Sequence, residues 1–154
     1  MLLADQDRSR WNRDAIERAT VLVDRAARMR RPGRFQVQAA IAATHARASA
    51  WPATDWKEIT RLYDLLFELD PSPVVAMNRA IAIGELRGLH DGLAALGEVN
   101  GMLDRYHLFH ATHAELLRRA GRTAQAREAT ARALTLVSNE GERRLLQERL
   151  AALG

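Results

Sequence analysis

The sequence contains no cysteine among its 154 residues. Disulfide bonds, thiolate zinc sites and cysteine nucleophiles are therefore excluded, which fits a reducing compartment. No stretch approaches the ~18 uninterrupted apolar residues that a membrane helix needs, and the apolar start at Met1 runs directly into Asp5. We therefore expect a cytoplasmic chain with neither a signal peptide nor a membrane anchor.

Aromatic residues and lysine are also scarce. Phe, Trp and Tyr make up 5% of the chain although 47% of it is hydrophobic, so alanine and leucine supply most of the apolar content. This composition is typical of packed helices and predicts an all-α fold. Lys57 is the sole lysine, and the net charge of +4 arises from arginines interspersed with 19 acidic residues. That mixture argues against direct DNA binding by this domain.

Helix breakers and apolar periods divide the chain into about eight helices. The third helix has a natural cap at Asp55, and its apolar residues recur at i, i+3, i+4 and i+7. These residues are Ile59, Leu62, Tyr63, Leu66 and Leu69. In the first helix the predicted inner face is Ile16, Ala19, Val23, Ala26 and Ala27. The expected helices cover about 12–30, 34–50, 55–69, 73–87, 89–99, 104–120, 123–138 and 140–153.

A period of 33 residues links Asp55, Gly88 and Gly121, each of which stands between two predicted helices. This spacing is close to that of the tetratricopeptide repeat (TPR), whose paired helices bury their apolar faces only by stacking. Short connections favour antiparallel hairpins, so we expect a TPR-like right-handed solenoid with an inner groove for peptides or proteins. We predict one domain over 1–154. Its parts are a linker and long helix (1–32), degenerate repeats (33–138) and a capping helix (139–154).

The sequence offers little support for catalysis. It has no glycine-rich phosphate loop and no nucleophile elbow, and it predicts neither an enzyme nor a cofactor. His107, His110 and His113 follow one another at intervals of three on one helix, and adjacent pairs lie about 60° apart. One pair could share a metal, but all three span too wide an arc for one ion. We expect His110 to lie on the apolar stripe and donate to a backbone carbonyl in a neighbouring hairpin; a ligand or partner contact is the alternative.

Other polar positions allow structural and functional interpretations. Asn78 and Arg79 lie in the middle of the fourth helix, where asparagine is a mediocre helix former. A side-chain hydrogen bond to a neighbouring helix would explain Asn78, and recognition in the groove is the alternative. Trp51 is a candidate for a partly exposed contact. Two further sets have structural explanations: packing for Trp11 and Trp56, and a solvated helix end for Arg28, Arg30, Arg31 and Arg34.

Several blocks of sequence, in order along the whole chain, closely resemble the long C-terminal extension of a group of bacterial ECF sigma factors. The blocks are Asp5 to Asn12, Arg31-Pro32-Gly33, Gln38 to Ala43 with His45, Asp55-Trp56, Pro71 to Ala76 with Asn78-Arg79-Ala80, Tyr106-His107-Leu108, and Leu117 to Arg119 with Gly121-Arg122. Family members carry this TPR-like extension after their polymerase-binding and promoter-binding regions. Those sigma regions are absent here, which indicates an excised domain or a free-standing relative.

The resemblance implies a regulatory role in transcription initiation through protein contacts. The implied partners are the sigma regions of the same polypeptide, the RNA polymerase core, or a small YCII-related protein. We predict a partner-binding groove lined by Asn78, Arg79, Tyr106, His107 and His110, with no catalytic or metal-binding residue. A free-standing adaptor for an unrelated peptide or protein is the alternative, followed by an accessory domain that binds a small ligand.

Overall fold

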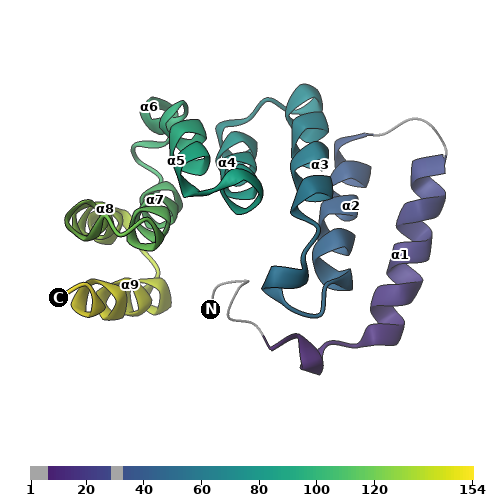
Figure 1. Ribbon diagram of the computed structural model, residues 1–154, viewed down its shortest axis with the longest axis horizontal. Helices are drawn as coiled ribbons and strands as arrows, with labels where there is room; N and C mark the ends of the chain where they lie inside the picture. The colour runs from purple at the N-terminus through teal and green to yellow at the C-terminus, as the bar shows by residue number, and fades with distance from the viewer. Residues whose placement is uncertain (1–6, 29–32) are drawn as a thin grey trace. The chain divides into compact units, whose positions relative to one another are not determined.

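The computed structural model describes residues 7–28 and 33–154, which are all-helical as the composition predicts (Figure 1). These ranges contain nine α-helices, two short 3-10 helices and no strand. The 3-10 helices are η2 (Arg8–Arg10) and η3 (Trp51–Ala53). The α-helices are α1 (Arg13–Arg28), α2 (Arg34–Arg47), α3 (Trp56–Leu69), α4 (Pro73–Arg87), α5 (Leu89–Gly97), α6 (Asn100–Leu103), α7 (His107–Arg119), α8 (Thr123–Leu136) and α9 (Glu140–Ala152).

Most predicted boundaries are confirmed to within a few residues, but the helix expected over 104–120 begins later. A separate four-residue helix, α6, precedes it, and a turn leads into α7 at His107. A helix this short is missed because it gives no periodic apolar pattern. The second helix ends at Arg47 instead of Ala50, since Ala48 and Ala50 have extended backbones that lead into η3. The predicted stop at Arg31-Pro32 lies outside the described residues, as do Arg30 and Arg31 of the basic run.

The chain divides into two compact units, Met1–Pro71 and Ser72–Gly154. In the first unit α1 packs on α2, and α2 packs on α3. Its core is made by α2 and α3, where the buried side chains include Val37, Ile41, Ile59, Leu62 and Leu66. This confirms the predicted inner face of the third helix except at its end, because Leu69 lies beyond the last packed turn and is 44% exposed.

Helix α1 is the least buried helix of the first unit. Ile16, Thr20 and Val23 are half-buried on one side, whereas Ala19, predicted on this face, is exposed. The predicted face was wrong at this position, and Thr20, one step further along the helix, is half-buried instead.

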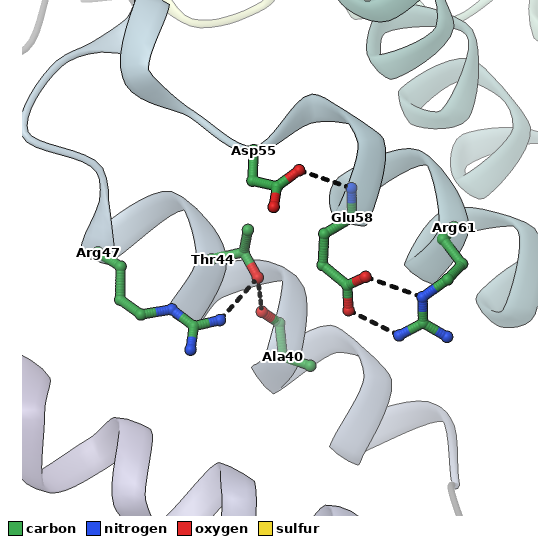
Figure 2. Close-up of polar contacts among 6 residues, drawn as sticks. All are labelled: Ala40, Thr44, Arg47, Asp55, Glu58 and Arg61. Carbon is green, nitrogen blue, oxygen red and sulfur yellow. Dashed lines mark hydrogen bonds and ion pairs between the residues drawn. The ribbon is translucent and has the colours of Figure 1, made fainter.

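Polar contacts stabilise the end of α2 and the start of α3, each within its own helix, as Figure 2 shows. The Asp55 carboxylate caps α3 by accepting a hydrogen bond from the Glu58 backbone N–H at 3.0 Å, as predicted for this residue. Arg61 donates to both oxygens of Glu58, at 2.8 and 2.6 Å, and these bonds lower the pKa of the Glu58 carboxyl. On α2, Thr44 donates to the Ala40 carbonyl at 2.9 Å.

Three apolar clusters make up the interior of the second unit along α4 to α9. One cluster joins α4, α5, α6 and α7 through Met77, Ala80, Leu96, Val99, Leu103, Phe109 and Leu116. Two further clusters join α7, α8 and α9, where Ala126 and Ala133 are fully buried. Full burial of these two alanines shows that small side chains fill the contacts that α8 makes with its neighbours.

Sequence neighbours pack together within each unit: α4 with α5, α5 with α7, α7 with α8, and α8 with α9 in the second. Neighbour-on-neighbour packing is what short connections predict. Right-handed stacking of the whole chain stays a prediction. Over residues 7–28 and 33–154, no helix combines the length and apolar content that crossing a bilayer requires.

Candidate functional site

All five residues of the predicted groove belong to the second unit. Asn78 and Arg79 are half-buried in the middle of α4. Tyr106, His107 and His110 lie together at the start of α7, where Tyr106 is the residue before the first helical turn. The two helices share a core through Met77 on α4 and Phe109 on α7. The groove prediction therefore concerns two groups on separate helices of one packed body.

His110 is held inside the fold. Only 7% of the residue is exposed, and its Nε2 donates to the Asp104 carbonyl at 2.8 Å. Since a carbonyl can only accept, the proton sits on Nε2. The predicted bond to a backbone carbonyl is confirmed, but the carbonyl lies in the turn before α7 and not in a neighbouring hairpin. A partner at the surface would therefore reach little of this residue.

His107 has a polar partner on another helix. Its Nε2 lies 2.8 Å from Oε2 of Glu142 on α9, and 22% of the histidine side chain is exposed. Nearby, the guanidinium of Arg132 on α8 donates to Asp104 at 3.1 Å. The start of α7 is thus tied by side chains to both following helices. A sequence separation of 35 residues hides such a contact from pattern analysis.

His113 differs from the other two histidines in its surroundings. It is half-buried, and its ring lies 6.0 Å from the ring of Phe109 between centroids. Burial lowers the pKa of His113, and the neighbouring His110 lowers it further. Within the described residues, no three side chains of histidine, aspartate or glutamate are placed to hold a metal ion.

A second polar link joins α4 to the end of α7. Arg119 donates to both carboxylate oxygens of Glu85, and the Nη2 to Oε2 distance is 3.3 Å. These hydrogen bonds raise the pKa of the Arg119 guanidinium. This bidentate geometry fixes the orientation of both planar groups. The end of α4 is therefore anchored to the end of α7.

Three aromatic side chains gather in the first unit, at the junction of α2 and α3. The rings of Trp51 and Trp56 are 4.5 Å apart, and that of His45 lies 5.4 Å from Trp56. The predicted packing role of Trp56 is confirmed by these contacts, and Trp51, the exposed-contact candidate, is half-buried. Arg8 approaches the same helix end and is almost completely buried. No sequence signal distinguishes it from the neighbouring exposed arginine, Arg10.

Comparison with known proteins finds a relative that matches most of this chain. The chain is 45% identical over 142 residues to a Rhizobium meliloti (strain 1021) protein described as "Uncharacterized protein R00370". The match covers 92% of this chain but 34% of the relative, so the chain spans about a third of that protein's length. No family model matches the chain, and no solved structure matches it.

Proposed function

We propose that this chain is a regulatory protein-interaction domain, the TPR-like C-terminal extension of an ECF sigma factor. The observation that carries the proposal is the series of sequence blocks, from Asp5 to Arg122, that resembles such extensions in order. The matched relative supports it from another direction, because sequence related to this chain forms part of a protein about three times as long.

The all-helical packing supports a role as a binding surface. Helical repeat proteins bind partners along the surface formed by successive helices, which needs no catalytic group. In our proposal Asn78 and Arg79 on α4, with Tyr106 and His107 at the start of α7, contact the partner. His110 does not contact the partner in this proposal; it holds the turn before α7 in place through its hydrogen bond to the Asp104 carbonyl. The partner is the sigma regions, the polymerase core or a small YCII-related protein, in the cytoplasm.

The first test is a pull-down from the source cell with this chain as bait, scored by mass spectrometry. We expect sigma regions, polymerase subunits or a small YCII-related protein to be recovered, and recovery to fall at least ~10-fold with N78A/R79A, as for loss of a contact worth about 1.4 kcal/mol. The matched control is Q125A/R127A, an amide and an arginine exposed on α8. Circular dichroism should show equal helicity in all three proteins.

The outcomes separate this proposal from a free-standing adaptor. Recovery of unrelated proteins alone would favour the adaptor, and equal loss with both double variants would remove Asn78 and Arg79 from the interface. The genomic reading frame gives an independent test. Sigma-like regions upstream in the same frame would exclude the adaptor, and their absence would count against our proposal.

A further inference from the structure

Arg8 is a buried arginine whose partners are backbone carbonyls and an aromatic ring. Only 2% of the residue is exposed. Its Nη1 donates to the carbonyls of His45 at 2.9 Å and Ala48 at 3.1 Å, and its guanidinium carbon lies 5.3 Å from the centre of the Trp11 ring. The carbonyls of the last turn of a helix lack partners within the helix and carry its negative dipole end. Arg8 thus caps α2 from a segment 37 residues away.

A second arginine reinforces this cap. Nη1 of Arg13, in the first turn of α1, donates to the Ala46 carbonyl at 3.2 Å. Three carbonyls at the end of α2 therefore receive hydrogen bonds from the segment 8–13. Between the two arginines, η2 is itself fixed because the Asp7 carboxylate accepts bonds from both the N–H and the hydroxyl of Ser9. The segment 7–13, which we call the strap, is fastened across the end of α2.

Some buried polar atoms beneath the strap have no hydrogen-bond partner. Nε and Nη2 of Arg8 are buried without a hydrogen-bond partner, and so is Nδ1 of His45. Each orphaned group costs free energy that an opened strap would regain from water. The imidazole of His45 stacks against Trp51 and meets Trp56 edge-on, while the backbone carbonyl of the same residue accepts the hydrogen bond from Arg8. These unpaired donors and acceptors make the free-energy difference between the closed and the open strap smaller than it would be if all of them were hydrogen-bonded.

We propose that the strap is a proton-sensitive latch: it stays closed while His45 is neutral, and protonation of His45 releases Arg8 and opens the segment 7–13. The reason is electrostatic. A protonated His45 would place a second positive charge beside the buried guanidinium, in an environment that screens charge poorly. Burial, followed by the charge of Arg8, lowers the pKa of His45, which agrees with this geometry. This inference does not depend on the proposed function.

The surrounding charges do not cancel the repulsion between a protonated His45 and Arg8. The charged groups at this helix end are Arg8 from η2, Arg13 from α1, Arg47 on α2, and Asp55 and Glu58 at the start of α3. Asp55 caps α3, and Glu58 is engaged by Arg61, so both carboxylates already have partners. The remaining three groups are cations, and of these the charge of Arg8 disfavours a proton on His45.

The direction of the pH dependence follows from the lowered pKa. In the open strap His45 regains an ordinary pKa near 6.5 and binds a proton more readily than in the closed one. The latch is therefore fully closed above pH ~6.5 and opens as the pH falls through the lower pKa of the closed form.

Tryptophan fluorescence of the full chain tests the latch directly, since the chain's three tryptophans, Trp11, Trp51 and Trp56, all lie at it. We expect the emission maximum to shift to longer wavelength between pH 7.5 and 5, as water reaches the rings. H45Q should abolish this shift. H113Q, which removes another half-buried histidine with a lowered pKa but lies in the second unit, should leave it intact.

Two fluorescence outcomes would overturn the proposal. One is a red shift of unchanged size in H45Q. The other is a loss of intensity without a red shift in the unmodified chain, because a protonated imidazole can quench tryptophan in a strap that remains closed.

Trypsin cleavage at pH 7.5 supplies a second test, independent of titration. In R8M the guanidinium that fastens the strap is lost, and we expect cleavage after Arg10 and Arg13 to quicken roughly tenfold, because cleavage follows the open population. R10M, which changes an exposed arginine of η2, should leave cleavage after Arg13 unchanged. Hydrogen exchange of α8 should be the same in all proteins, showing that the second unit is intact. Unchanged cleavage after Arg13 in R8M would refute the latch.

Discussion

Histidine illustrates how one residue type takes different tasks in this chain. On α7, His110 donates to a carbonyl of its own turn, His107 reaches Glu142 on α9, and His113 packs near Phe109. The sequence shows the three at equal spacing and predicts the stripe that buries His110. Their partners depend on the path of the chain before and after α7, and the periodicity of one helix gives no information about that path.

Stability should fall in mild acid, in part through His113. Burial and the neighbouring His110 lower its pKa, so the unfolded chain binds this proton more readily than the folded one. The stability is therefore intact above pH ~6.5 and is lost as the pH falls through the folded-state pKa. Urea unfolding of the second unit at pH 7.5 and 5.5 should show a smaller pH difference for H113Q than for the unmodified chain. H90Q, at an exposed position on α5, is the control; an equal reduction there would contradict the assignment.

At the scale of the element, capping hydrogen bonds stabilise the starts and ends of the helices. Asp55, Ser72 and Asn139 each accept a hydrogen bond from the backbone N–H three residues later, at the starts of α3, α4 and α9. At the other end, Arg143 of α9 donates to the Leu134 and Val137 carbonyls at the end of α8. The caps at helix starts follow from local sequence, whereas the arginine caps at helix ends come from other elements.

The crossing of α4 and α5 should be sensitive to a single methyl group. A Cβ atom on Gly92 would lie 2.7 Å from the Cα of Gly84 and 3.1 Å from the Ala80 carbonyl oxygen, and backbone atoms cannot swing aside. We expect G92A to lower the free energy of unfolding by about 1–3 kcal/mol. G97A on the same helix has open space around its new methyl and should cause no loss. Denaturant unfolding of both variants measures the difference, and equal stabilities would show that the crossing adapts without cost.

At the scale of the whole molecule, the chain forms two compact units that meet in sequence between Pro71 and Ser72. The sequence predicts the end of α3 and the start of α4 from Asp70, Pro71 and Pro73, since proline ends one helix and suits the first turn of the next. It does not show that packing divides there. The same prolines would also be expected in a tight hairpin between two helices of a single unit.

The second unit should fold without the first. The three apolar clusters that join α4 to α9 use residues from Met77 to Leu146, all within the second unit. We expect a fragment of residues 72–154 to be helical by circular dichroism and to unfold cooperatively. The control fragment 89–154 lacks α4, and with it Met77 and Ala80 of the core, and should lose cooperativity. A non-cooperative transition in 72–154 would show that this unit needs the first.

The sequence by itself determined the all-α class, most helix boundaries and the cap at Asp55. These follow from composition, breakers and short-range periodicity, which act over one or two turns. Tertiary structure decided the division into two units, the partners of His107 and His110, and the burial of Arg8 under the strap. Such contacts join positions far apart in sequence, as with the 37 residues between Arg8 and His45, and no local pattern encodes them.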